Sequence, residues 1–398
     1  SARAGAGAPM PAGGSGAATR ASPASVPTLL EVTSLSRHFA LGGFGAKHRL
    51  HAVDDVGFTI GHKEIVALVG ESGSGKSTVA RLLALVYPPT SGEIRFSGTA
   101  VSSLRGRRNK RAYRGRVPMV FQDPYSSMNG TYRVSHGIMR AIALHRPELP
   151  RASRHGEAVR VMEAVGLSPG EVMLTKFPYE LSGGQRQRVG IAQALALRPE
   201  LILADEPVSM LDVSIRAGLL NLMAELRERE GVSFLYITHD LASARYIADR
   251  VLVMYAGHLV EMGPVEQVLA APQHPYTKLL LSAAPDPRAP LDLSGAADAG
   301  EPPKVVNPRP GCRFRPRCPV AVTECATVTP VLGEVATGQL AACHVALAVA
   351  RGDARNSEGA RTTEEGSNSE QGSNSKEGSS SQNGRAGLGG REAAASPT

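Results

Sequence analysis

The segment Gly70–Ser77 most constrains what this chain can fold into. It reads Gly-Glu-Ser-Gly-Ser-Gly-Lys-Ser and fits the phosphate-binding pattern G-x-x-x-x-G-K-[ST] at every fixed position. The preceding run Glu64–Val69 is mostly apolar and has the length of a strand. Apolar side chains recur downstream at the i, i+3, i+4, i+7 spacing of a helix, at Val79, Leu82, Leu83 and Val86. A glycine-rich loop between a buried strand and a helix is the context that nucleotide binding requires, so the chain is predicted to bind a nucleotide.

Each residue type in this segment has a physical role in holding a triphosphate. Glycines let backbone N–H groups turn inward around the β-phosphate, and the helix N-terminus adds partial positive charge. Lys76 would bridge β- and γ-phosphate oxygens, and Ser77 would hold Mg²⁺. A plain Gly-Ser turn before a helix is the alternative, which the lysine and serine argue against. The predicted nucleotide contacts here are Gly70, Glu71, Ser72, Gly73, Ser74, Gly75, Lys76, Ser77 and Thr78.

A second strand-like run, Leu201–Pro207, ends in two adjacent carboxylates, Asp205 and Glu206. Side chains alternate along a strand, so these two carboxylates point in different directions and cannot do the same job. We expect Asp205 to hold magnesium through water and Glu206 to face the attacking water as a general base. Alone, the pair would be interpreted as two solvated acids at a strand end. Together with the phosphate segment, it predicts a hydrolase.

Between these two runs lies Leu181–Gln185, Leu-Ser-Gly-Gly-Gln, which opens a helical pattern. Ser182 is expected to cap that helix, and a helix start with two glycines and a hydroxyl is itself an anion site. With this segment the chain resembles the ATP-binding-cassette (ABC) ATPases over about residues 28–290, since several motifs follow in the family's order. The resemblance implies ATP contacts from Ser182, Gly183, Gly184 and Gln185.

The resemblance also implies roles for further polar residues. Gln122 would sense magnesium and the attacking water, and His239 would contact the γ-phosphate. The loop Ser209–Asp212 would cross to an opposing subunit, with Asp212 near the nucleotide there. Phe39 would stack on adenine, with core packing as its alternative role. Each of these residues alone is more often structural, so the prediction depends on their occurring in series.

The implied fold class is α/β, a P-loop NTPase of the ABC ATPase type. It comprises a RecA-like core, an antiparallel β subdomain, a helical signature subdomain and a small Cys-rich C-terminal appendage. The predicted organisation is a disordered segment at 1–27, the ATPase domain at 28–270 with its helical subdomain at about 124–190, the Cys-rich region at 271–350 and a disordered tail at 351–398. The tail contains a crude polar repeat at 365–376.

In proteins of this family, ATP lies between the phosphate loop of one subunit and the serine-capped helix of another. One chain would then hold half a site, and closure on ATP would be a ligand-driven shift of a two-state interface. The expected partner is a second ATPase subunit, either a copy of this chain or a paralogue.

Composition limits what the chain does by itself. No apolar run approaches the ~20 residues that a membrane-spanning helix needs, so a transport pathway would come from other chains. The first 27 residues are rich in Ala, Gly, Pro and Ser and show no secretory signal pattern. Net charge is +8, with a local excess of arginine and lysine between residues 105 and 116. We expect a solvated helix face there, before a strand at Val117–Phe121. Proximity to anionic lipid is the alternative, and no nucleic-acid partner is expected, since aromatic residues are not interleaved with the charges.

Two segments resemble the branch of the family that imports dipeptides, oligopeptides and nickel. They are Asp123–Asn129, after the glutamine, and His274–Leu280, beyond the nucleotide domain. The resemblance implies that Tyr125 to Asn129 contact a short helix of a membrane subunit. The chain departs from the branch at Gly130 and Gln193, where proline and arginine are usual.

All the cysteines, Cys312, Cys318, Cys325 and Cys343, fall in a short C-terminal region. In an intracellular ATPase, clustered thiols more often bind metal than form disulfides. The same Cys-rich ending in the peptide-importer branch, and the softness and count of four thiolates, favour a [4Fe–4S] cluster. Zinc, or unligated or oxidised thiols, remain as alternatives because the spacings match neither ferredoxins nor zinc ribbons.

The sequence therefore predicts an ATPase subunit that energises import of dipeptides or oligopeptides, with ATP and Mg²⁺ as cofactors. Its partners would be the second ATPase, two membrane permeases and, indirectly, an extracytoplasmic solute-binding protein. It would lie peripherally on the cytoplasmic face of the membrane. The alternatives are an importer of nickel or another small solute, a soluble ABC ATPase acting on DNA or ribosomes, and a regulatory binding module.

Overall fold

The computed structural model describes residues 27–42, 47–123, 128–282 and 305–352. The predicted disordered ends fall almost wholly outside these ranges, as do Tyr125 to Ser127 of the expected membrane contact. The strands are β1 (Thr28–Leu41), β2 (His48–Gly61), β3 (Ile65–Val69), β4 (Ser91–Phe96), β5 (Thr99–Ala100), β6 (Met119–Val120), β7 (Leu201–Asp205), β8 (Ser233–Thr238), β9 (Arg250–Tyr255), β10 (His258–Pro264), β11 (Gly333–Ala336) and β12 (Gln339–Ala341).

The helices include short 3₁₀ turns, labelled η. They are α1 (Lys76–Leu83), η2 (Val101–Ser103), α2 (Gly106–Arg116), α4 (Val134–His145), α5 (Arg151–Ala164), α6 (Gly170–Thr175), η3 (Pro178–Glu180), α7 (Gly183–Leu195), α8 (Val213–Glu230), α9 (Leu241–Ile247), α10 (Val265–Ala270), α11 (Pro275–Ser282), η5 (Arg315–Arg317), η6 (Thr323–Ala326) and α12 (His344–Arg351). Among the described residues, no helix is both long and apolar enough to cross a membrane.

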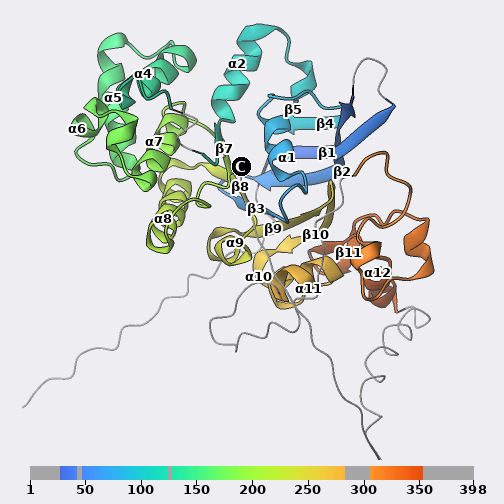
Figure 1. Ribbon diagram of the computed structural model, residues 1–398. Coiled ribbons are helices and arrows are strands. Elements are labelled where there is room, and N and C mark those ends of the chain that lie inside the picture. Colours follow the sequence, from blue (N-terminus) through green and yellow to red (C-terminus); the bar gives the residue numbers. More distant parts are fainter. Residues whose placement is uncertain (1–26, 43–46, 124–127, 283–304, 353–398) are drawn as a thin grey trace, which may run out of the picture.

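The strands of the described residues form two sheets (Figure 1). An antiparallel sheet has the strand order β2-β1-β4-β5, and a larger mixed sheet has the order β11-β12-β10-β9-β3-β8-β7-β6. In the larger sheet, β3 pairs in parallel with β8 and β9, and β7 pairs in parallel with β8. Every residue of β3, β7 and β8 is buried, as expected for central parallel strands covered on both faces.

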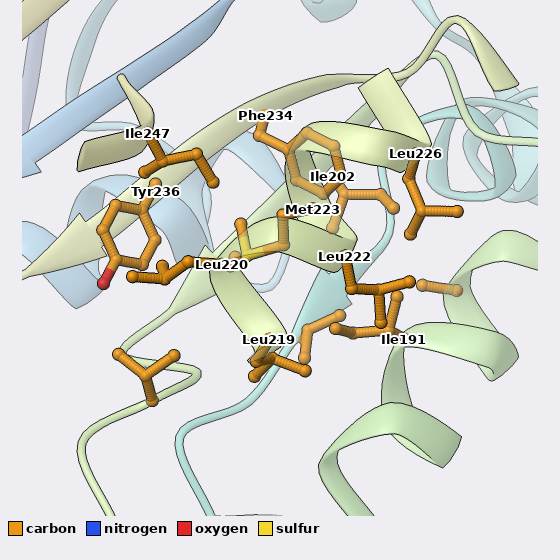
Figure 2. Close-up of a cluster of buried hydrophobic side chains, with 14 of the residues drawn as sticks. Ile191, Ile202, Leu219, Leu220, Leu222, Met223, Leu226, Phe234, Tyr236 and Ile247 are labelled. Atoms are coloured by element: carbon orange, nitrogen blue, oxygen red, sulfur yellow. The ribbon is translucent and has the colours of Figure 1, made fainter. Parts of the chain in front are cut away.

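Helix α8 covers one face of this sheet with an apolar stripe (Figure 2). Its buried side chains pack on Ile202 of β7 and on Phe234 and Tyr236 of β8, and Ile191 of α7 joins them. The stripe consists of Leu219, Leu220, Leu222, Met223 and Leu226. This packing joins the helical part of the chain, α4 to α7, to the central strands.

Two details differ from the sequence expectation. Helix α1 ends at Leu83, and Val86, which the apolar spacing placed on its buried face, is 54% exposed beyond it. Leu85 adopts a left-handed backbone conformation with φ 55°, which is incompatible with continuing the helix. The strand expected at residues 117–121 is reduced to β6, and Phe121 is exposed.

The arginine cluster lies on α2, whose residues are exposed apart from Tyr113 and Gly115, as expected for a solvated face.

The C-terminal region is built into the main sheet rather than attached beside it as an appendage. Strand β12 pairs with β10, and β11 pairs with β12, so the region extends the sheet at one edge. A further bridge joins Leu50 of β2 to Val306. The predicted domain boundaries stay predictions. Within residues 305–352, strands β11 and β12 belong to the same sheet as the strands of the nucleotide domain.

Burial of His274 generates a prediction about pH. This side chain is 1% exposed, its Nδ1 accepts a hydrogen bond from the Tyr276 N–H (3.0 Å), and burial lowers its pKa from 6.5 to about 3. The unfolded chain therefore binds a proton near pH 6.5 that the folded chain does not, and stability falls as the pH falls towards about 3. Between roughly pH 7 and pH 5, this one group should remove about 2 kcal/mol of unfolding free energy.

Urea unfolding at the two pH values, for the wild type and His274→Asn, measures this contribution. Asparagine retains an acceptor but does not titrate, so the variant should lose about 2 kcal/mol less on acidification than the wild type. Equal losses would show that His274 is not buried in its neutral form.

Candidate active site

The predicted phosphate segment forms a loop that only glycine can close. Gly70 and Gly75 have φ values of 153° and 107°, and a Cβ atom at either position would lie 2.1 Å from the Met254 carbonyl oxygen or 2.2 Å from the Ala52 carbonyl oxygen. The backbones of β9 and β2 thus pack directly against the outside of the loop. The loop runs from the end of β3 directly into α1, which begins at Lys76.

Lys76 is 5% exposed and lies within its own loop. Its Nζ donates hydrogen bonds to the carbonyl oxygens of Gly70 (2.7 Å) and Glu71 (2.8 Å). Burial lowers the pKa of Lys76, and the carboxylates of Glu206, Asp205 and Glu71 oppose that shift. A buried ammonium held only by carbonyl oxygens can exchange them for phosphate oxygens, which is the role predicted for this residue.

Ser77 and Asp205 meet across the site although they lie far apart in the sequence. The Ser77 hydroxyl donates to Asp205 Oδ1 at 2.9 Å. Burial raises the pKa of Asp205, while the Ser77 hydrogen bond lowers it. A hydroxyl beside a partly desolvated carboxylate supplies the hard oxygen ligands that Mg²⁺ prefers.

Three polar side chains converge on Glu206, the residue after β7. Gln122 donates from Nε2 to Glu206 Oε2 at 2.9 Å, and His239 Nδ1 lies 3.4 Å from the same oxygen. The Ser209 hydroxyl donates to the Glu206 carbonyl oxygen at 3.1 Å. Glu206 itself has φ 46°, a left-handed conformation that turns the chain out of the strand. The structure therefore brings together the predicted Lys76, Ser77, Gln122, Asp205, Glu206 and His239.

The Leu-Ser-Gly-Gly-Gln segment starts α7 as predicted. Ser182 Oγ accepts a hydrogen bond from the Gln185 N–H at 3.2 Å, and Gln185 Oε1 accepts one from the Ser182 N–H at 3.0 Å, forming a capping box. Gly183 packs near Leu211, in the loop that leads to Asp212. Within the described part of the chain, no hydrogen bond or ion pair joins this segment to the loop Gly70–Ser77, and Asp212 is exposed.

Phe39 lies on β1 opposite Leu50 of β2 and is half-buried. Its ring meets Tyr87 edge-on at 5.4 Å between centroids, and the Arg37 guanidinium lies 4.6 Å above it. The adenine contact predicted for Phe39 stays a prediction.

Contacts from the C-terminal region to the phosphate loop were not predicted from the sequence. Tyr276 of α11 accepts a hydrogen bond at its hydroxyl oxygen from the Glu71 N–H (2.9 Å), and Arg317 of η5 forms a two-point ion pair with the Glu71 carboxylate. These residues lie 205 and 246 positions from Glu71, and no local pattern marks the pairing.

The four cysteines are free in the structure. Cys325 lies within η6, Cys318 directly follows η5, Cys343 caps the start of α12, and Cys312 precedes η5. Cys312, Cys318 and Cys343 accept backbone N–H hydrogen bonds at sulfur, although burial is the larger effect and raises the pKa of all three, that of Cys318 to about 11. In the described residues, the only three His, Cys, Asp or Glu ligand atoms found within 4.8 Å of one another belong to His38, His51 and Asp54. Asp54 also forms an ion pair with Arg313, so a guanidinium already neutralises it.

Comparison with known proteins relates this geometry to a family. The ABC transporter family matches residues 53–209, and the oligopeptide/dipeptide transporter C-terminal region matches residues 260–325. The probable peptide ABC transporter ATP-binding protein y4tS of Sinorhizobium fredii is 45% identical over 324 residues, which are 80% of this chain and 90% of that protein. The putative oligopeptide transport ATP-binding protein YkfD of Bacillus subtilis is 43% identical over 319 residues, 80% of this chain and 95% of that protein.

A solved structure supports the same assignment. The dimeric, post-hydrolysis structure of the ATP-binding cassette MJ0796 with ADP and Pi superposes with a TM-score of 0.53 at 26% identity, over 60% of this chain and 99% of that one. The predicted ABC ATPase fold is thereby confirmed. The chain belongs to the ATP-binding subunits of ABC transporters, and it carries the C-terminal region of the oligopeptide/dipeptide transporters.

Proposed function

We propose that this chain hydrolyses ATP to energise uptake of dipeptides or oligopeptides through partner membrane permeases. The observation that carries the proposal is the convergence of Gln122 and His239 on the Glu206 carboxylate, beside the Ser77–Asp205 hydrogen bond. This chain matches the oligopeptide/dipeptide transporter C-terminal region, and its relatives are named as peptide or oligopeptide transport proteins, which supports a peptide as the solute.

The residues divide the work of hydrolysis between them. Lys76 and the inward N–H groups of the loop bind the phosphates and stabilise the charge that develops on them. Glu206 accepts a proton from the attacking water, while Gln122 and His239 hold its carboxylate oxygen in place. Ser77 and Asp205 would hold Mg²⁺, which when bound neutralises phosphate charge.

We infer that a second ATPase subunit completes the site. The MJ0796 cassette is dimeric in the state with ADP and Pi, and within the described residues of this chain no hydrogen bond or ion pair joins the serine-capped start of α7 to its own phosphate loop. The apolar side chains Met210 and Val213, on either side of Asp212, are 64% and 79% exposed. Exposed apolar side chains beside a polar loop are typical of a protein interface. Two permeases and a place on the cytoplasmic face of the membrane complete the proposed importer.

Four free thiols in one short region supply the number and softness of ligands that an iron–sulfur cluster needs. The backbone N–H groups that point at Cys312, Cys318 and Cys343 suit thiolate ligands. We propose that the four cysteines hold an iron–sulfur cluster that stabilises the short segment between them.

Replacing Glu206 tests the hydrolytic assignment. Glu206→Gln should lower the ATPase kcat by about 10²–10⁴-fold, because a positioned carboxylate base is lost. ATP binding should persist, since Lys76 and the loop are intact. The matched control is Glu228→Gln on α8, whose side chain is 66% exposed and pairs only with the adjacent Arg227 among the contacts described. Unchanged turnover in Glu206→Gln would contradict the assigned role.

Uptake assays then test the coupling to transport. In vesicles that contain the permeases and the solute-binding protein, Glu206→Gln should abolish uptake of a labelled oligopeptide, while Glu228→Gln should not. Peptide uptake that survives without hydrolysis would show that ATP only regulates the partner. Uptake of nickel in place of peptide would overturn the proposed solute.

Anaerobic purification tests the cysteine assignment. The chain should show visible iron–sulfur absorbance and contain iron and acid-labile sulfide, and Cys318→Ser should lose all three signals because one of four ligands is removed. Bound zinc without iron would contradict the proposal, as would the absence of any metal from anaerobically prepared protein.

A further inference from the structure

The segment that carries the cysteines lies against the phosphate loop. Arg317, immediately before Cys318, places its guanidinium across the Glu71 carboxylate, with Nη1 3.0 Å from Oε2 and Nη2 3.1 Å from Oε1. The two side chains are 14% and 23% exposed, so solvent screens the pair only in part. A two-point contact between a guanidinium and a carboxylate fixes orientation as well as charge.

Glu71 creates an electrostatic problem for a loop that binds an anion. It is the second residue of the loop, and its carboxylate is near enough to affect the pKa of Lys76. An unpaired carboxylate at this position would repel the phosphates that Lys76 attracts. The Arg317 guanidinium cancels that charge without occupying the inside of the loop.

Aromatic packing holds Arg317 and Glu71 in place. The Arg317 guanidinium lies 5.7 Å from the ring centroid of Tyr255 and 5.8 Å from that of Phe314. Tyr276 is fully buried, with its ring 4.6 Å from Tyr255 and 5.6 Å from Phe314. Its hydroxyl oxygen accepts a hydrogen bond from the Glu71 N–H, so the C-terminal region fixes both the backbone and the side chain of Glu71.

A second contact reaches the other side of the loop. Arg313 forms an ion pair with Asp54 and donates to the Ala256 carbonyl oxygen at 2.5 Å. The next residue, Gly257, donates its N–H to the Ser74 carbonyl oxygen at 2.9 Å. The segment Cys312–Cys318 therefore supports the loop directly at Glu71 and, through the turn between β9 and β10, at Ser74.

We propose that Arg317 and Tyr276 are positioning residues for ATP: they neutralise and orient Glu71 so that the phosphate loop is preorganised before nucleotide arrives. The inference makes the C-terminal region part of the nucleotide site. It rests on ATP binding by this chain and is independent of the solute that is transported.

Binding of Mg²⁺ with a non-hydrolysable ATP analogue to the purified full chain, measured by calorimetry, tests the proposal. Arg317→Ala should raise Kd about tenfold, because the competent loop conformation becomes a minor population and Glu71 is left unpaired. Tyr276→Phe keeps the ring and should raise Kd about threefold, through loss of one neutral hydrogen bond. The matched control, Arg315→Ala, removes an exposed arginine of the same 3₁₀ turn and should leave Kd unchanged.

Two further readouts separate positioning from general destabilisation. In steady-state ATPase assays, Arg317→Ala should raise KM while kcat at saturating ATP stays within about twofold, since Glu206 and its partners are untouched. Adding Glu71→Gln to Arg317→Ala should recover most of the lost affinity, because the unpaired carboxylate is gone. Unchanged Kd in Arg317→Ala, or a double variant that binds no better than the single one, would overturn the proposal. Failure of Glu206→Gln to stop hydrolysis would instead count against the catalytic assignment.

Discussion

The parallel register of three buried strands is the constraint on which the site depends. Val69 of β3 pairs with Thr238 of β8, and Asp205 of β7 pairs with the neighbouring Ile237. Three strands therefore end at one level of the sheet, and the residues that follow them meet at that edge. The phosphate loop follows β3, Glu206 follows β7 and His239 follows β8. In parallel sheets ligands bind beyond the carboxyl ends of the strands, and here the register alone brings three distant segments together.

Local patterns were sufficient to predict the chemistry at this edge but not its surroundings. The phosphate loop and the Asp205–Glu206 pair could be located because glycine, lysine and carboxylate requirements apply within a few residues. The ion pair between Arg317 and Glu71 could not be predicted in this way, because it joins residues 246 positions apart through tertiary packing. Spacing also failed at Val86, where a left-handed Leu85 ends α1 although the apolar pattern continues. Pairing of β12 with β10, which makes the expected appendage part of the main sheet, likewise depends on contacts that no short segment reveals.

In one chain, the catalytic side chains are already in contact, whereas the proposed contact of ATP with a serine-capped helix start needs a second subunit. Glu206, Gln122 and His239 are already in contact, and Lys76 is held by carbonyl oxygens that phosphate oxygens can replace. The capped start of α7 offers backbone N–H groups and a serine hydroxyl, but it packs beside the loop that leads to Asp212. An anion site of this kind gains affinity when a second subunit presents it to the bound triphosphate. Closure would then depend on ATP, and opening on its hydrolysis.

The most direct test of this account is the oligomeric state of the Glu206→Gln chain, measured by light scattering with and without saturating Mg²⁺ and ATP. We expect a dimer, with this chain or with a paralogue, that forms only with ATP and is lost when Ser182→Arg places a bulky cation at the start of α7. A chain that stays monomeric with ATP, even beside its partner ATPase and the permeases, would contradict it.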